Sequence, residues 1–219
     1  TGVATGFRRV GSLSLALTSE RLEELKRGAS MARAFGVEVE EISISEAARR
    51  HPLVDMTGVT GAIYLPGDGQ ADPGNVALSM ARGATLAGVT IAEDVKVTAI
   101  TQAGGRVTGV ITDQGPIRSS VIINCAGMWG REVGRMAGVH LPLQACEHFY
   151  VVTEASDEIP RGLPVLRVTD ECAYYKEDAG KILLGAFEPR AKPWGMDGIP
   201  DTFCFDELPA DLEHFQTIL

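Results

Sequence analysis

The sequence lacks the segments that would place a chain in or across a membrane. No apolar run approaches the roughly 20 residues needed to span a bilayer, and the N-terminal residues TGVATGFRRV lack the apolar centre of a signal peptide. Basic charge is also scarce, because the net charge is -9 and the pI is near 5.0. Since phosphate groups are bound by clustered positive charge, the sequence predicts no nucleic-acid partner, no membrane partner and no export.

Motifs of several common enzyme classes are missing as well. The chain contains no GxGxxG and no GxxxxGK[ST], the glycine-rich loops that hold dinucleotides and nucleoside phosphates. It also contains no GxSxG and no HExxH, which occur in many hydrolases and metalloproteases. The sequence therefore has no recognisable phosphate loop of its own, and an ordinary hydrolase is not supported.

Cysteine is scarce and scattered. The four cysteines are Cys125, Cys146, Cys172 and Cys204, with no CxxC pair and no close histidine partner of the kind that metal sites use. Their strand-like surroundings, such as IINCAG and FCF, suit free thiols that act as small buried hydrophobic side chains. We therefore expect no metal site and a reducing compartment, either the cytoplasm or, in a eukaryote, the mitochondrial matrix.

What the sequence does contain is a pattern of helices and strands long enough to enclose a core. Its 219 residues, 45% of them hydrophobic, suffice for one large domain or two small ones. Residues 18–36 predict a helix, with Thr18 as its N-cap and apolar side chains at helical spacing. A strand at 37–44 and a short helix at 45–50 follow, and the next residue, His51, is expected at the surface.

The middle of the chain begins with a loop at 66–75 that is rich in glycine, proline and aspartate. Asp72 is predicted to cap a helix that has Pro73 at its first position and ends at Gly88. This helix precedes a long stretch that is mostly strand-like.

Residues 96–127 predict three β segments, joined by a glycine hairpin at 104–105 and a turn at 114–115. The last segment contains VIIN at 121–124, which is apolar on both faces, as is typical of a strand in a parallel α/β layer. Small residues at 125–127 come next and a short helix begins behind them. Such a turn either brings a ligand close to the backbone or packs a strand tightly against a helix.

The C-terminal third predicts an antiparallel sheet. Strand patterns at 147–154 and 163–168 precede a hairpin over 172–187 that turns at 178–180. A final helical pattern without a C-cap indicates a helix that is cut rather than finished. The apolar residues on its one face are Leu212, Phe215 and Leu219.

The strand pattern at 147–154 starts unusually, because Glu147 and His148 stand directly before an apolar run. Alternation along a strand places His148, Tyr150 and Val152 on one face. His148 is therefore either a core histidine with a satisfied hydrogen bond or a side chain displayed in a cleft.

Five motifs in a fixed order give the sequence a resemblance to one family. They are AIYLPGDGQADP, GGRVTGVITDQGPI, VIINCAGMWGREVGRMAGV, EHFYVVTE and CAYYKEDAG. Together they resemble the dimethylglycine and sarcosine dehydrogenases, which belong to the D-amino-acid-oxidase-like flavoproteins. The resemblance implies an FAD enzyme that oxidises the N-methyl group of a small N-methyl amino acid, with hydride passing from the methyl carbon to flavin.

The resemblance also implies a mixed α/β or α+β fold. This fold comprises the central part of an FAD-binding domain of the glutathione-reductase type and an antiparallel-sheet substrate domain with flanking helices. The implied division is residues 1–66 for the first part of the substrate lobe, 67–140 for a partial FAD-binding domain and 141–219 for a truncated substrate domain. In this family the GxGxxG loop and the histidine that carries flavin covalently precede the matched region. We therefore expect a central fragment that is inactive alone and retains FAD weakly or not at all.

Two catalytic residues follow from the resemblance. His148 and Tyr174 match the histidine and tyrosine that face each other across the substrate in this family. An imidazole can orient an amine or accept its proton, and a phenol can bond the substrate carboxylate or amine. Strand alternation gives only one of Tyr174 and Tyr175 access to the cleft, and Tyr174 fits the match better. Arg167 is a weaker candidate for holding a carboxylate, since a surface ion pair explains it equally well.

Four cofactor-binding residues are also implied. Val97 matches a family valine whose backbone contacts the flavin nucleotide, and Trp129 matches an aromatic residue that contacts the cofactor. Ala126 and Gly127 belong to the same turn as Trp129. Without the family, Val97 is an ordinary strand valine.

The identity of the substrate and a non-catalytic function stay open. The sequence does not distinguish dimethylglycine from sarcosine or a related methylated amine as the substrate. Many members of the family carry a folate-binding module further along the chain, so folate is a further partner that the resemblance implies, and nothing in these residues bears on it. EHFY also resembles the regulatory subunit of pyruvate dehydrogenase phosphatase, a relative that acts as a binding protein. His148 and the tyrosine pair favour catalysis over that alternative.

Overall fold

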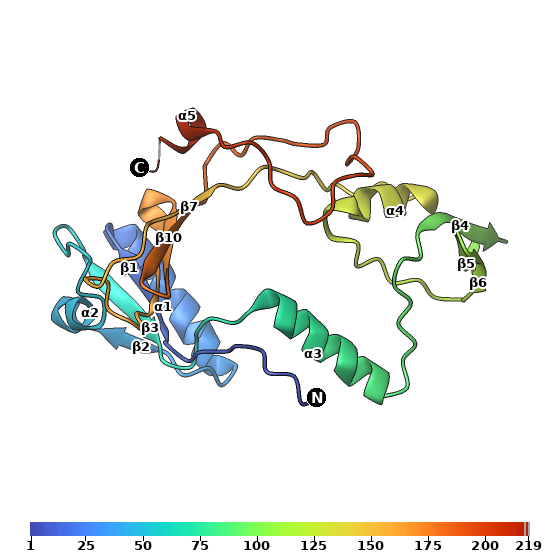
Figure 1. Cartoon of the computed structure of the whole chain (residues 1–219). Helices are drawn as coiled ribbons and strands as arrows, with labels where there is room; N and C mark the ends of the chain where they lie inside the picture. The colour runs from blue at the N-terminus through green and yellow to red at the C-terminus, as the bar shows by residue number, and fades with distance from the viewer. Residues whose placement is uncertain (217, 219) are drawn as a thin grey trace. The chain divides into compact units, whose positions relative to one another are not determined.

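The computed structural model describes residues 1–216 and 218 and has a mixed α/β fold, as the sequence predicts. Its contacts divide the chain into two compact units (Figure 1). Unit 1 comprises Thr1–Gly88, His148–Arg190 and Asp211–Leu219, and unit 2 comprises Val89–Glu147 and Ala191–Ala210. The three-part division implied by the family resemblance stays a prediction.

Unit 1 is built on a seven-stranded sheet with the strand order β2-β3-β1-β8-β9-β10-β7. β1 and β8 are parallel, whereas the other neighbouring strands are antiparallel, so the antiparallel sheet predicted for the C-terminal third is confirmed. The predicted hairpin turns at Ala179 and Gly180, whose φ angles of 52° and 78° suit a type I′ turn. The strands are β1 (Ser12–Ala16), β2 (Glu40–Ile42), β3 (Gly61–Leu65), β7 (Tyr150–Val152), β8 (Val165–Val168), β9 (Ala173–Asp178) and β10 (Lys181–Ala186).

The first helix, α1 (Ser19–Ala34), packs on one face of this sheet. Its predicted N-cap is confirmed, because Thr18 Oγ1 accepts a hydrogen bond from the Arg21 amide at 3.1 Å. The buried side of α1 meets Ile63 of β3 and Val39, which precedes β2. The helix therefore covers the β2-β3-β1 end of that face.

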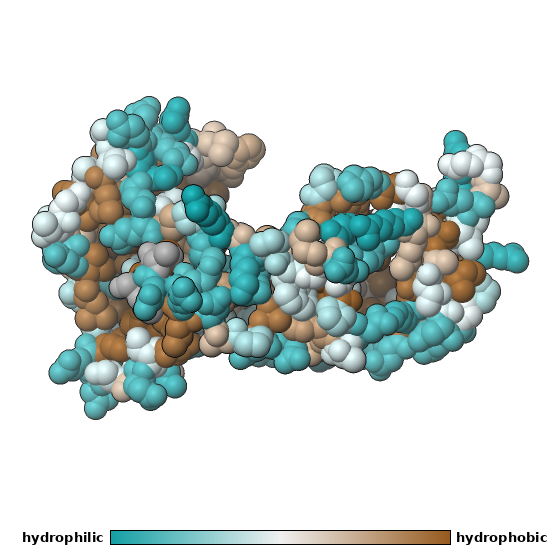
Figure 2. Space-filling view, turned by 90° about the horizontal axis from the view of Figure 1, so that it is seen from above, coloured by the Kyte–Doolittle hydropathy of each residue, from teal (hydrophilic) through white to brown (hydrophobic). Residues whose placement is uncertain are grey.

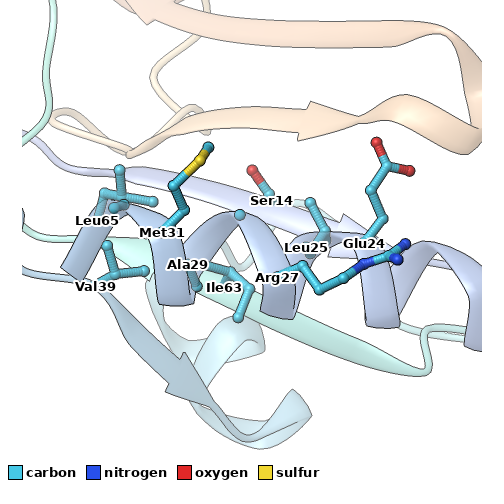
Figure 3. Close-up of a pocket in the computed structure, with 11 residues that line it drawn as sticks. Ser14, Glu24, Leu25, Arg27, Ala29, Met31, Val39, Ile63 and Leu65 are labelled. Carbon is cyan, nitrogen blue, oxygen red and sulfur yellow. The ribbon is translucent and has the colours of Figure 1, made fainter. Parts of the chain in front are cut away.

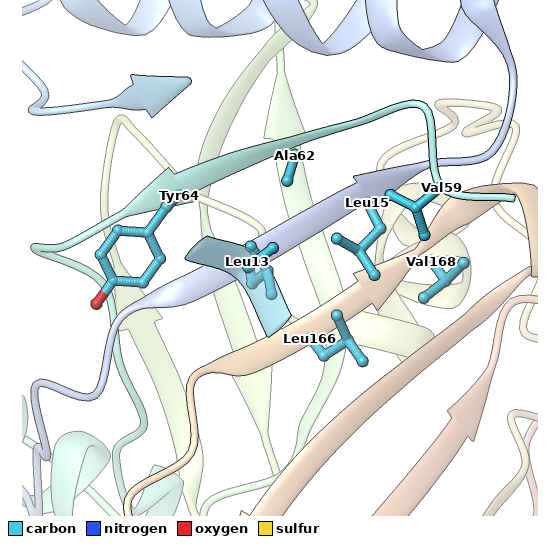
Figure 4. Close-up of a cluster of buried hydrophobic side chains, with 8 residues drawn as sticks. Leu13, Leu15, Val59, Ala62, Tyr64, Leu166 and Val168 are labelled. Atoms are coloured by element: carbon cyan, nitrogen blue, oxygen red, sulfur yellow. The ribbon is translucent and has the colours of Figure 1, made fainter. Parts of the chain in front are cut away.

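The main apolar core lies on the opposite face of the sheet, where Ala47 of α2 (Ile44–Arg50) joins it. Alternate residues of β1, β3 and β8 point into this core because successive strand residues face opposite sides. α2 begins earlier than the predicted range of 45–50, since Ser43 rather than a later residue caps it. Figure 4 shows the cluster, whose buried members are Leu13, Leu15, Ala47, Val59, Ala62, Tyr64, Leu166 and Val168.

Two expectations for this region are wrong. The predicted strand at 37–44 is limited to β2, because Ile42 is the last residue that pairs with β3. His51, expected at the surface, is 4% exposed and its Nδ1 has no hydrogen-bond partner in the described residues. Burial lowers the pKa of the His51 imidazole below its ordinary value of 6.5. The chain after α2 folds back over the core, which short-range patterns do not reveal.

Two further helices belong to unit 1. α3 (Pro73–Leu86) has its predicted cap, because Asp72 Oδ1 accepts a hydrogen bond from the Asn75 amide at 2.7 Å. α3 buries none of its own side chains. The final helix, α5 (Leu212–Phe215), buries Phe215 but leaves Leu212 64% exposed, so the predicted common face is wrong for that pair. The third residue predicted for this face, Leu219, lies outside the described residues.

Unit 2 contains a three-stranded antiparallel sheet of β4 (Val97–Ala103), β5 (Arg106–Thr112) and β6 (Gly115–Arg118). A 3-10 turn, η1 (Gly127–Trp129), leads into the short predicted helix α4 (Gly130–Met136). The strand predicted at 121–124 is wrong, since no described strand pairs with these residues. Val121 and Ile123 are 68% and 80% exposed. An apolar segment forms a buried strand only where neighbouring strands and layers supply partners.

The cysteines also differ from expectation. Cys125, Cys146 and Cys204 are exposed and Cys172 is partly buried, so the predicted burial of four thiols is wrong. The segments around Cys125 and Cys204 form no strand in the described chain, which leaves both thiols uncovered.

Other apolar side chains are also visible at the surface (Figure 2). In the part of the chain that the structure describes, no helix is long and apolar enough to cross a membrane.

Candidate functional site

The β8-β9-β10-β7 end of the unit 1 sheet has an open face. Strand pairing aligns Arg167, Tyr174, Gly185 and Tyr150 as successive cross-strand partners on these four strands. Cross-strand partners project from the same side of a sheet. Tyr175 packs against the main core, so Tyr174 and its row project from the opposite side. This is the side on which α1 covers the other end of the sheet.

His148 and Tyr174 meet on this open face. Tyr174 Oη lies 3.2 Å from His148 Nε2, and the two rings are nearly parallel, with centroids 6.1 Å apart. The phenol donates this hydrogen bond when Nε2 carries no proton. Phe187 completes the cluster, with its ring 5.0 Å from that of Tyr174 and 5.6 Å from that of His148. The structure therefore brings together the two residues predicted to be catalytic.

The segment around His148 differs in one detail from the prediction. The strand β7 begins at Tyr150, so His148 precedes the strand instead of starting it. Pairing nevertheless extends backwards, because the Phe149 carbonyl accepts a hydrogen bond from the Ala186 amide at 3.1 Å. His148 is exposed whereas Phe149 is partly buried, so the predicted alternation is present and His148 is displayed at the surface of the open face.

The phenol of Tyr174 stays protonated through the neutral range. Burial is the main cause that raises the pKa of this phenol above its ordinary value of 10.0, and the charges of Tyr150 and Glu188 add to the effect. A neutral phenol can donate a hydrogen bond to an anionic oxygen or to an unprotonated nitrogen. The pair thus combines a hydrogen-bond donor with an imidazole that can accept a proton.

Arg167 supplies positive charge beside the pair. It is exposed and lies directly across from Tyr174 on β8, and its guanidinium has no hydrogen-bond or ion-pair partner among residues 1–216 and 218. The surface ion pair that the sequence left open is therefore absent from the described residues. A free guanidinium binds carboxylates well because its donors match the two oxygens.

The four residues predicted to bind cofactor all lie in unit 2. Ala126, Gly127 and Trp129 share the turn that opens α4, and Val97 is the first residue of β4. A Cβ added at Gly127, whose φ is +53°, would meet nothing within 4 Å, and Trp129 is 39% exposed. The turn is thus open at its backbone and carries an accessible indole, which fits a flat ligand lying against it.

Two residues of the unit 1 site were not predicted from the sequence. Phe187 and Gly185 face the cluster because they alternate along β10 and its continuation, and this period-2 signal in LLGAF was available in the sequence. Their relation to Tyr174 depends on the pairing of β9 with β10. That pairing follows once the turn at 179–180 is placed.

A separate apolar depression lies beside α1 (Figure 3). It has a volume of about 520 Å³ and is lined by side chains that include Leu25 and Met31 of α1, Ser14 of β1 and Ile63 of β3. None of the predicted site residues lines it.

No group of three histidine, cysteine, aspartate or glutamate side chains suited to a metal ion occurs among the residues the structure describes.

Comparisons with known proteins agree with the resemblance seen in the sequence. The sequence matches the family described as FAD dependent oxidoreductase over residues 1–219. It is 37% identical over 218 residues to the 4-methylaminobutanoate oxidase (formaldehyde-forming) of Paenarthrobacter nicotinovorans. The aligned region covers 100% of this chain and 26% of that relative. It is 37% identical over 220 residues to the mitochondrial sarcosine dehydrogenase of Homo sapiens, covering 98% of this chain and 24% of the relative.

The same level of similarity extends to a regulatory protein. The chain is 37% identical over 222 residues to the mitochondrial pyruvate dehydrogenase phosphatase regulatory subunit of Mus musculus, covering 100% of this chain and 25% of the relative. It thus spans about a quarter of the length of these curated relatives. Among solved structures, L-proline dehydrogenase from P. horikoshii shares the fold, with a TM-score of 0.80 over 98% of this chain and 55% of that chain at 24% identity.

Proposed function

The chain belongs to the FAD dependent oxidoreductase family, and we propose that its unit 1 sheet forms the substrate-binding face of an enzyme that oxidises small N-methyl amino acids. When bound, FAD supplies the acceptor for the hydride that leaves the N-methyl carbon. The observation that carries the proposal is the 3.2 Å contact between His148 and Tyr174 on an open face. Two relatives at 37% identity, named for sarcosine and 4-methylaminobutanoate, support this substrate class.

Each side chain of the site has a proposed role. His148 Nε2 accepts the proton of the substrate ammonium, because an amine must lose its proton before its N-methyl carbon can give up hydride. When the substrate binds, the Tyr174 hydroxyl donates its one hydrogen bond to the amine or the carboxylate instead of to His148 Nε2, which leaves Nε2 free to accept the proton. The raised pKa of Tyr174 keeps the phenol protonated. Arg167 holds the substrate carboxylate with two parallel hydrogen bonds.

The residues of unit 2 are proposed to contact the flavin. The open backbone at Gly127 and the exposed indole of Trp129 suit a planar cofactor, and Ala126 and Val97 are placed with them by the family resemblance. The sequence contains no glycine-rich phosphate loop. We therefore propose that these 219 residues alone bind FAD weakly.

The test uses the FAD-loaded form of the polypeptide that carries these residues, mixed with sarcosine or dimethylglycine in the absence of oxygen. We expect the visible absorbance of the flavin to bleach. His148→Ala is expected to lower kcat/KM by about 10²- to 10⁴-fold, the usual contribution of a general base. A wild-type protein whose flavin is reduced by dithionite but by no N-methyl amino acid contradicts the proposal.

A non-catalytic binding function is the alternative, because a regulatory subunit is as similar to the chain as the two enzymes are. The same bleaching experiment separates the two. Glycine, which has no N-methyl group, and Arg167→Gln provide the controls: glycine should leave the flavin oxidised, and the variant should raise KM more than it lowers kcat.

A further inference from the structure

Tyr174 lies directly over a glycine of the neighbouring strand. If Gly185 carried a Cβ, that atom would lie 1.9 Å from Tyr174 Cζ and 2.2 Å from both Cε1 and Oη. Real Cβ atoms essentially never approach other heavy atoms more closely than 3.0 Å. The phenol ring therefore occupies the space that any other residue at position 185 would fill.

This overlap explains how Tyr174 reaches His148. Tyr174 on β9 and Gly185 on β10 are cross-strand partners, and β7, which follows His148, pairs with the far side of β10. A side chain on β9 can reach a group beyond β10 only by crossing over β10. The bare backbone at Gly185 makes that crossing possible, and the phenol ends 3.2 Å from His148 Nε2.

Phe187 limits the movement of the ring on one side. It lies two residues after Gly185, and its ring packs 5.0 Å from that of Tyr174 at an angle of 42°. It also packs 5.6 Å from the ring of His148. Gly185 leaves room below the phenol, and Phe187 stands beside it, so the orientation is set before any ligand is present.

The backbone of Gly185 does not itself require glycine. Gly185 is absent from the residues with positive φ, so its conformation is open to alanine. The three nearest atoms to a Cβ at this position all belong to the Tyr174 side chain. Glycine inside a strand weakens the sheet, which makes a close approach by a neighbouring group the physical reason for its presence here.

We propose that Gly185 is a positioning residue, whose missing side chain lets Tyr174 lie across β10 and hold its phenol against His148. The two groups then meet the substrate at a fixed spacing. The value of this spacing for catalysis rests on the proposed function, but the positioning itself can be measured with neither flavin nor substrate.

The first experiment replaces Gly185 by alanine and follows the rings by NMR on the chain itself. In the wild type we expect nuclear Overhauser contacts between the rings of His148 and Tyr174. Gly185→Ala should abolish them, because the added methyl group pushes the phenol off β10. The pKa of Tyr174 should also fall toward its ordinary value, since burial is the main cause that raises it. Unchanged contacts and an unchanged phenol titration would overturn the proposal.

Gly61→Ala is the matched control. Gly61 is a strand glycine on the same face of the same sheet, and an added Cβ would lie 2.5 Å from Leu22 Cδ1. This Cβ would approach its neighbour less closely than the 1.9 Å at Gly185, and it would meet a side chain of α1 instead of Tyr174. We expect Gly61→Ala to leave the contacts between His148 and Tyr174 intact. Their loss in this variant too would mean that any disturbance of the sheet releases the phenol, and would refute a specific role for Gly185.

A double-mutant cycle with Tyr174→Ala separates positioning from general structure. Without the phenol ring, an alanine at 185 meets no obstacle, so Gly185→Ala should shift the His148 resonances in the wild type but not in the Tyr174→Ala background. The cycle also tests the proposal if the Gly185→Ala chain does not fold. Recovery of folding in the double variant supports the clash with Tyr174, and failure of both variants overturns it.

In the FAD-loaded protein, the same substitution should lower kcat/KM by about 10- to 100-fold, because a displacement of about 1 Å at a reacting group has effects of this size. Loss of the ring contacts with unchanged turnover would leave the positioning intact and contradict the proposed function. Retained ring contacts with reduced turnover would contradict the positioning by Gly185.

Discussion

The two units contain sheets of very different burial. The seven-stranded sheet of unit 1 has apolar clusters on both faces, with Leu13 and Leu15 of its interior strand β1 0% and 1% exposed. In the three-stranded sheet of unit 2, Ile111 and Ile117 are 37% and 52% exposed. Fully burying one such side chain contributes about 1.5–3 kcal/mol. The first sheet is therefore stabilised by its core, whereas the second depends mainly on its strand-to-strand hydrogen bonds.

This contrast matters for the site. Tyr174 is carried by β9 of the sheet that has a core, and His148 lies two residues before β7 of the same sheet. The opposite side of β9 is anchored in the core by Tyr175. The residues proposed to contact flavin lie in the unit with little apolar burial. Precise placement of catalytic groups needs rigid supporting elements, and unit 1 supplies them from its own residues.

The largest expected effect tests the core directly. Leu15→Ala should lower the free energy of unfolding of unit 1 by about 3 kcal/mol, because a buried leucine leaves a cavity when it is truncated. Hydrogen exchange of the β1 amides measures this. Ile117→Ala should lower the free energy of unfolding of unit 2 by less than about 1 kcal/mol. Tryptophan fluorescence measures this unfolding, since Trp129 and Trp194 both lie in unit 2. Equal losses would remove the contrast between the units.

The next effect concerns a buried charge in unit 1. The side chain of Glu177 is 0% exposed and lies 3.6 Å from Arg161 and 4.0 Å from Arg8. Its two oxygens accept hydrogen bonds from the amides of Gly162 and Gly180 at 3.0 and 2.9 Å. Glu177→Gln should cost about 2 kcal/mol in chemical denaturation, because a hydrogen bond to a charged group contributes about 1.5–3 kcal/mol.

The neighbouring residue Asp178 provides the control for this prediction. Asp178 Oδ1 lies 3.0 Å from Arg8, but its side chain is 63% exposed. Asp178→Asn should therefore cost less than about 1 kcal/mol, as is usual for surface ion pairs. A larger loss for Asp178→Asn than for Glu177→Gln would mean that burial does not decide the strength of these contacts.

A smaller effect is expected at two helix caps, which repeat the contrast within unit 1. Thr18 caps α1, which packs on the sheet, whereas Asp72 caps α3, which buries none of its own side chains. Thr18→Ala should lower the stability of unit 1 by about 1 kcal/mol. Asp72→Ala should speed hydrogen exchange at the start of α3 and leave β1 unchanged. If either substitution changed hydrogen exchange at both α3 and β1, the two helices would be equally coupled to the stability of the sheet.

The smallest effect is a dependence on pH. Burial lowers the folded-state pKa of His51 below 6.5, so the unfolded chain binds the proton more readily. The stability contributed by neutral His51 is therefore full above about pH 6.5 and is lost as the pH falls toward the folded-state pKa. His51→Gln should flatten this part of the stability profile, whereas His140→Gln, at an exposed position of unit 2, should not. An identical slope in wild type and His51→Gln would contradict this assignment.

The sequence predicts the features that are set by neighbouring residues. The caps at Thr18 and Asp72 and the hairpin turn at 179–180 occur where expected, because each depends on hydrogen bonds or φ angles within a few positions. Alternation also places His148 on one face with Tyr150 and Val152, as observed, but it did not decide whether that face is buried or open. The roles of these site residues in catalysis remain predictions.

The features that depend on distant partners were not predictable in this way. Residues 121–124 have a strand-like composition, yet no described strand pairs with them. His51 is buried by chain that folds back over it, and Cys125 is exposed because the segment before it forms no strand. The crossing of Tyr174 over Gly185 requires the pairing of two strands, which a periodicity in one strand does not specify.

The parallel pairing of β1 with β8 has a consequence for biosynthesis. β1 is translated long before β8, and β3 can pair with β1 early, but the other neighbour of β1 is not complete until residue 168. Until then the apolar strand β1 keeps one open edge, the kind of surface that promotes aggregation during translation. Such long-range closure also slows folding. Yield in a cell should consequently respond more to chaperone supply and growth temperature than the finished protein's stability would indicate.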